Sequence, residues 1–201
     1  MGILLDQLIE ALINIALFSA IPVIWWLIFY KKQFNFFEFV GLKKLQIKNK
    51  KTYTLAFVFL TALSLAGAYT IKSMPMLQKH SATTNLPGTG FIYIIVVLIF
   101  SFIKTGLAEE IFFRGFLAKR IIARVGFTYG NLIQSLIFGA LHGIMFFKVA
   151  GLPTALIITV LISINAWLSA WINEKQSNGS ILSSWLLHGL SNFIVGMLAL
   201  V

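Results

Sequence analysis

The sequence predicts an all-α fold, a polytopic transmembrane helical bundle of about six spans with one additional amphipathic or interfacial helix. Two observations support this prediction. Hydrophobic residues make up 59% of the 201 residues and charged residues only 11%, whereas a soluble domain carries about 25% charged residues. The apolar residues also gather into runs near the roughly 20 residues that a helix needs to cross a bilayer. Membrane lipid is therefore an expected partner of much of the surface.

Six apolar runs are candidate membrane spans. The first ends in an aromatic belt of Trp25, Trp26 and Tyr30, which is typical of a membrane interface. The third continues without a proline through residues 108–125 and stops before Gly126. In chain order the runs are residues 11–30, 53–71, 91–107, 131–147, 153–172 and 180–201.

The segments between the runs complete the predicted order of elements. Residues 34–39 are rich in phenylalanine beside lysines, which favours a helix lying in the membrane interface. Residues 72–90 are polar and contain Pro75 and Pro87, so they are expected to form a loop. The first ten residues lack the basic start of a cleaved signal, so the first run is expected to be a retained helix.

The net charge of +10 comes from basic residues in the short segments between the runs. That distribution is typical of membrane topology and argues against a nucleic-acid partner. Seven lysines lie between the first and second runs, and four further basic residues follow the third. The positive-inside bias then predicts an integral protein of the cytoplasmic (plasma) membrane with both basic segments facing the cytoplasm. The absence of cysteine excludes a thiolate nucleophile.

Few ionisable groups lie at membrane depth, and they fall on three of the predicted helices. Each such group costs about 2.5–3.5 kcal/mol to insert, which makes it a functional candidate. Glu110 and Arg114 are four residues apart and can pair along one helix face, whereas Glu109 points about 100° away from Glu110. The candidate residues are Glu109, Glu110, Arg114, His142, His188 and Asn192.

Two chemistries fit these residue types. A carboxylate beside imidazoles can activate water as a general base, and histidine and asparagine side chains can donate hydrogen bonds to an oxyanion. Alternatively, Glu109, His142 and His188 could ligate zinc and leave one position open for water. The helix motif of soluble metalloproteases, two histidines around a glutamate, is absent, so the sequence does not require a metal and both chemistries stay open.

Three ordered motifs carry a family resemblance. Glu109-Glu110-x-x-x-Arg114, Phe138-x-x-x-His142 and His188-x-x-x-Asn192 resemble those of the CPBP (CAAX protease and bacteriocin-processing, or Abi) intramembrane proteases, which include the type II CAAX prenyl endopeptidases. The resemblance predicts a catalytic core over residues 91–201, preceded by a transmembrane hairpin and basic loop over residues 1–90, in one continuous membrane domain.

The resemblance also implies roles for the motif residues. Glu109 would be the base that activates water with help from His142, His188 and Asn192 would stabilise the oxyanion, and Glu110 with Arg114 would support them. The implied substrate is a membrane-associated protein or peptide, either lipidated or carrying a leader. Under this resemblance the metal-free chemistry is favoured, with no cofactor expected and zinc as the alternative. The similar depths of His142 and His188 in their helices predict a shared cavity that opens toward the cytoplasm.

Two other classes of function fit the same composition. A non-catalytic membrane immunity or scaffold protein could keep this fold, because function lies in the site rather than in the fold. A small transporter could use the carboxylates as a proton relay, although the chain shows no internal repeat of the kind common in transporters.

Overall fold

The computed structural model describes residues 2–83 and 86–198, and these residues form helices and short connections without a β-strand. Three of the helical segments, η1 to η3, have π-helical hydrogen bonding. In chain order the elements are α1 (Gly2–Phe29), α2 (Phe36–Val40), α3 (Lys50–Ser73), α4 (Pro75–Lys79), α5 (Gly90–Leu98), η1 (Ile99–Leu107), α6 (Ala108–Glu110), η2 (Ile111–Ala118), α7 (Lys119–Val125), α8 (Phe127–Trp171), η3 (Ile172–Gln176) and α9 (Leu182–Leu198).

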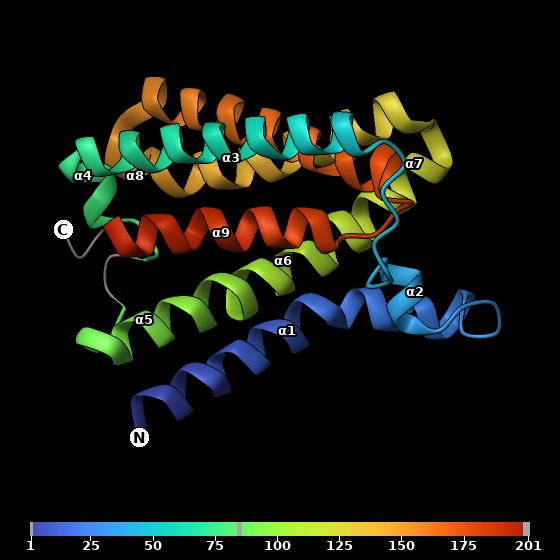
Figure 1. The fold of residues 1–201 in the computed structure, drawn as a ribbon, viewed down its shortest axis with the longest axis horizontal. Helices are drawn as coiled ribbons and strands as arrows, with labels where there is room; N and C mark the ends of the chain where they lie inside the picture. Colours follow the sequence, from blue (N-terminus) through green and yellow to red (C-terminus); the bar gives the residue numbers. More distant parts are fainter. Residues whose placement is uncertain (1, 84–85, 199–201) are drawn as a thin grey trace.

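A long helix made of α5, η1, α6, η2 and α7 lies in the middle of the bundle (Figure 1). It packs against α1 on one side and against α9 on the other, while α3 and α8 cover the far side of α9. The prediction that the third apolar run continues unbroken to Gly126 is therefore confirmed. At 36 residues, this helix is roughly 54 Å long, so it exceeds the roughly 30 Å hydrocarbon core of a bilayer.

Four helical segments are long and apolar enough to cross a membrane in the described part of the chain, and the last of them contains both the fourth and the fifth predicted runs. A shorter apolar helix occupies most of the sixth predicted run, whose last residues, 199–201, lie outside the described residues. The first run is longer than predicted, because the helix already begins at Gly2. The spanning helices are Gly2–Phe29, Lys50–Thr70, Gly90–Val125 and Phe127–Gln176.

The last of these four helices reverses direction at Gly151, which has a φ of 73° and a ψ of 171°. Gly126, between α7 and α8, has nearly the same conformation, with φ 80° and ψ 167°. This region of backbone space is essentially restricted to glycine. Asn131 Nδ2 donates to the carbonyl oxygen of Trp167 at 2.9 Å, which joins the two arms on either side of Gly151. The fourth and fifth predicted runs are thus the two arms of one helical hairpin.

One prediction for the connecting segments needs correction. Residues 72–90 are not loop throughout, because α4 forms inside them with Pro75 at its first position, where the missing N–H costs no hydrogen bond. The aromatic segment 34–39 forms a helix, α2, of five residues. The Phe39 and Val40 side chains are buried against η2, whereas the Phe34 and Phe37 side chains are exposed.

Close packing inside the α8 hairpin gives a testable difference between two glycines. A Cβ atom at Gly139 would lie 2.4 Å from the carbonyl oxygen of Thr159, whereas a Cβ at Gly67 in α3 meets no atom within 4 Å. We expect Gly139→Ala to lower the free energy of unfolding by about 1–3 kcal/mol through overpacking. Gly67→Ala is expected to raise it by up to about 1 kcal/mol, because alanine favours helix. Thermal unfolding of both variants in detergent measures the difference, and equal effects would contradict the hairpin packing.

Candidate active site

The acidic pair lies at the centre of the long middle helix. Glu109 and Glu110 belong to α6, a three-residue α-helical segment between the π-helical segments η1 and η2. π-Helical turns occur often at functional sites, where they alter the direction of side chains. The Glu110 side chain is 1% exposed and the Glu109 side chain 19%, so the two carboxylates occupy different environments.

Glu110 is held by several donors. Arg114 Nη1 lies 3.1 Å from Glu110 Oε1 as an ion pair four residues along the helix. His188 Nδ1, from α9, lies 3.1 Å from the same oxygen, and the Ser184 hydroxyl donates to Glu110 Oε2. A carboxylate only accepts hydrogen bonds, so His188 donates through Nδ1–H. The orientation of the His188 ring is therefore set by Glu110.

Glu109 faces the other nitrogen of the same ring. Its Oε2 lies 3.9 Å from His188 Nε2, which is too long for a direct hydrogen bond. This oxygen is buried and has no hydrogen-bond partner among the described protein groups. A buried polar atom without a partner is unusual and calls for a ligand or water in the functional state. Glu109 Oε2 and His188 Nε2 are therefore the two atoms of the site best placed to bind a ligand or water.

His142 reaches the same region from the first arm of α8. Its Nδ1 donates to the carbonyl oxygen of Phe138 at 2.9 Å, so the neutral ring keeps Nε2 as an acceptor. The Phe138 ring packs near all three groups: its centroid lies 4.0 Å from the Arg114 guanidinium, 4.5 Å from the His142 ring and 6.2 Å from the His188 ring. The second motif therefore contributes both an imidazole and the apolar wall shared by the other groups.

Asn192 lies two turns beyond Ser184 on α9, and its side chain is directed to η1. Its Nδ2 donates to Thr105 Oγ1 at 3.0 Å, and Thr105 in turn donates to the carbonyl oxygen of Phe100. The structure therefore brings Glu109, Glu110, Arg114 and His188 into one cluster. His142 lies beside this cluster with its ring packed on Phe138. Asn192 is hydrogen-bonded through Thr105 to the long helix that carries the glutamates.

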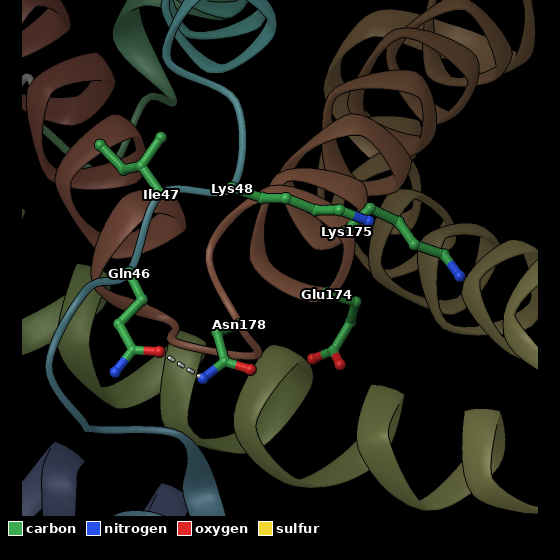
Figure 2. Close-up of a pocket in the computed structure, with 6 residues that line it drawn as sticks. All are labelled: Gln46, Ile47, Lys48, Glu174, Lys175 and Asn178. Carbon is green, nitrogen blue, oxygen red and sulfur yellow. Dashed lines mark hydrogen bonds between the residues drawn. The ribbon is translucent and has the colours of Figure 1, made fainter.

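An open hollow of about 570 Å³ lies elsewhere, at the basic end of the bundle (Figure 2). It is formed by the loop before α3 and by η3 with the turn that follows, and Asn178 Nδ2 donates to Gln46 Oε1 at 2.9 Å within it. None of the six predicted residues lines this hollow, so it is separate from the glutamate site. Its lining residues are Gln46, Ile47, Lys48, Glu174, Lys175 and Asn178.

The alternative metal site was Glu109, His142 and His188. Among the residues that the structure describes, no three His, Asp or Glu side chains have the geometry to hold a metal ion. Glu109 Oε2 and His188 Nε2 face each other at 3.9 Å, and the His142 ring packs on the Phe138 ring.

A family model covers this part of the chain. The type II CAAX prenyl endopeptidase Rce1-like model matches residues 91–194, which is about half of the sequence. The chain belongs to this family. The resemblance predicted from the three motifs is thereby confirmed, and all six predicted residues lie inside the matched region. No curated protein and no solved structure matches the chain.

Membership of the Rce1-like family supports a CAAX-type intramembrane protease activity and therefore a peptide substrate. The apolar helices support an integral membrane protein. The helices α1, α2, α3 and α4 lie outside the matched region. Of these, α1 packs directly on the helix that carries the glutamates, so the Rce1-like core is completed by the N-terminal part of the chain.

Sequence reasoning missed two polar residues of this Rce1-like site. Ser184 contacts Glu110, and Thr105 contacts Asn192. A signal was present, because Ser184, His188 and Asn192 are spaced by four residues and lie along one helical stripe. Extending the third motif by one turn toward the N-terminus would have found Ser184.

Proposed function

We propose that this chain is an intramembrane endopeptidase that hydrolyses a peptide bond of a membrane-associated or lipidated protein or peptide with water activated by Glu109. The observation that carries the proposal is the contrast between the two glutamates. Glu110 accepts hydrogen bonds from Ser184 and His188 and is paired with Arg114, whereas Glu109 Oε2 is buried, has no hydrogen-bond partner among the described protein groups, and faces His188 Nε2. Such a divergence of environments is typical of paired carboxylates with different tasks.

The proposed reaction begins with a water held by Glu109 and the free Nε2 of His142. Glu109 takes a proton from this water while the oxygen attacks the carbonyl carbon, and the carbonyl electrons move onto its oxygen. Glu109 then returns the proton to the departing amine as the carbon–nitrogen bond breaks. Each atom and proton is accounted for without a covalent enzyme intermediate.

The developing oxyanion requires donors on the opposite side of the carbonyl. In its protonated form, His188 donates from Nε2 while its Nδ1–H stays on Glu110, as in triads where a buried carboxylate orients an imidazole. The Asn192 amide has two N–H groups and uses one for Thr105, so the second remains for the substrate oxygen. Donors aimed at such an oxyanion are each worth about 10²–10³ in rate.

We also propose a cytoplasmic-membrane location with the site opening to the cytoplasm, and six membrane crossings. Six crossings result when the two arms of α8 are counted separately and the shorter α9 is added to the other three long helices. The basic end of the bundle, which includes Lys119, Arg120 and the loop before α3, supports this orientation.

Purified protein in liposomes, offered a library of lipidated and unlipidated peptides, tests the function. We expect cleavage of lipidated or leader-type peptides that persists in a strong chelator, because no step of the proposed reaction uses a metal. Inside-out membrane vesicles are expected to cleave added peptides, and right-side-out vesicles are not. Loss of cleavage with chelator and recovery with zinc would replace the metal-free mechanism. No cleavage of any peptide by the wild type would favour the scaffold interpretation.

A further inference from the structure

A chain of buried polar groups leads from η3 to the active-site cluster. Asn173, Ser184 and Glu110 are each 1% exposed, although they come from η3, α9 and α6. Buried polar groups of this kind are costly unless they are fully hydrogen-bonded, and a satisfied network fixes the geometry of its members. The network therefore constrains the geometry of Glu110, the active-site residue at its end.

The direction of the hydrogen bonds in this chain follows from chemistry. The backbone N–H of Ser184 can only donate, and it lies 3.3 Å from Asn173 Oδ1. This fixes the amide of Asn173, whose Nδ2 then donates to Ser184 Oγ at 2.7 Å. The single hydroxyl hydrogen of Ser184 is left to donate onward.

Two acceptors lie within reach of that hydrogen. One is Glu110 Oε2 and the other is the carbonyl oxygen of Ile181 at 3.1 Å. An ionised carboxylate is the stronger acceptor, roughly twice as strong as a neutral one. The hydrogen therefore points to Glu110, so the side-chain donors of Asn173 and Ser184 both point toward the active site.

We infer that Ser184 and Asn173 are positioning residues that hold the Glu110 carboxylate in the orientation in which it orients His188. With Oε2 bound by Ser184, Oε1 is left to accept a hydrogen bond from His188 Nδ1 and to form the ion pair with Arg114. The His188 ring is then turned so that Nε2 faces Glu109. This inference rests on the proposed function and names residues outside its three motifs.

Ser183 supplies a matched control on the same helix. It is also 1% exposed and its hydroxyl bonds to Tyr53 at 3.1 Å and to Ser177 at 3.0 Å, so its loss removes a comparable buried hydroxyl. Neither of these two partners is Glu110. Ser183→Ala and Ser184→Ala thus differ in their connection to the active site rather than in the kind of group removed.

The kinetic test compares these two variants in the peptide assay, with thermal unfolding recorded for both. We expect Ser184→Ala to lower kcat by about 10–100-fold, as loss of a supporting partner typically does, with KM changed less than about twofold. Asn173→Ala is expected to behave similarly, and the double variant to lose no more than the worse single, since residues that act as a unit are non-additive. Ser183→Ala should keep kcat within about threefold of the wild type. Equal kcat losses for Ser183→Ala and Ser184→Ala would overturn the inference while leaving the proposed function intact.

A second measurement does not depend on activity. Nitrogen NMR of labelled histidine in the full chain reports the hydrogen-bonded Nδ1–H of His188, assigned by comparison with a His188→Gln sample. We expect this signal to shift in Ser184→Ala and Asn173→Ala and to stay unchanged in Ser183→Ala. An unchanged His188 signal in Ser184→Ala would overturn the inference even if no substrate were cleaved by any variant.

Discussion

Glu109→Gln is expected to slow peptide cleavage by about 10²–10⁴-fold, the usual contribution of a positioned general base. Glutamine keeps the size of the side chain and both polar positions, but its amide cannot accept a proton from water at neutral pH. The substitution should also leave the fold intact, because Glu109 Oε2 has no hydrogen-bond partner among the described protein groups and Glu110 keeps its own donors. The loss should therefore appear in kcat rather than in stability.

The measurement is single-turnover cleavage in liposomes, with the unfolding midpoint recorded for the same preparations. Glu38→Gln is the matched control, since Glu38 is an exposed glutamate on α2 and lies far in sequence from Glu109 and Glu110. The control is expected to cleave like the wild type. Wild-type turnover by Glu109→Gln would contradict a glutamate-activated mechanism, and a large drop in its unfolding midpoint would assign Glu109 a structural role instead.

Sequence spacing predicted the parts of the site that follow the α-helical period. Glu110 and Arg114 are four residues apart and do pair, because the helix holds them on one face. The different orientation of Glu109 likewise follows from the 100° step between neighbouring residues, and its exposure differs from that of Glu110 as a result. The composition was enough to predict an all-helical membrane protein, since lipid demands that backbone groups be satisfied within each span.

Tertiary contacts explain what spacing did not predict. Asn173 and Ser184 meet only because η3 turns back onto the start of α9, and neither residue carries a signal of that contact in its immediate neighbours. The π-helical segments beside Glu109 also lie in tertiary contacts: η1 packs against α1 and α9, and η2 packs against α1, α2 and α8. The gap between the fourth and fifth predicted runs contains Gly151, whose positive φ turns the two arms of α8 into a hairpin. Hydropathy predicted the two arms but not the turn that joins them.

Glu110→Gln is expected to lower the free energy of unfolding by about 3–5 kcal/mol, because it leaves Arg114 as an uncompensated buried charge. The Arg114 side chain is 3% exposed and stacks over Phe138, so water cannot easily replace the lost carboxylate. Cleavage should fall as well, because the His188 ring loses the charged acceptor of its Nδ1–H. Chemical or thermal unfolding in detergent, with cleavage measured on the folded fraction, separates the two effects.

A double substitution distinguishes the structural role of the ion pair from its role in the site. In Glu110→Met/Arg114→Met, both buried charges are replaced by apolar groups, and such replacements are often neutral or stabilising. The hydroxyl of Ser184 still has an acceptor, since the carbonyl oxygen of Ile181 lies 3.1 Å away. We therefore expect stability to return close to that of the wild type while cleavage stays lost, because nothing orients His188 toward Glu109. Cleavage that returned together with stability would mean that Glu110 serves the fold alone, and the task of orienting His188 would then pass to another group.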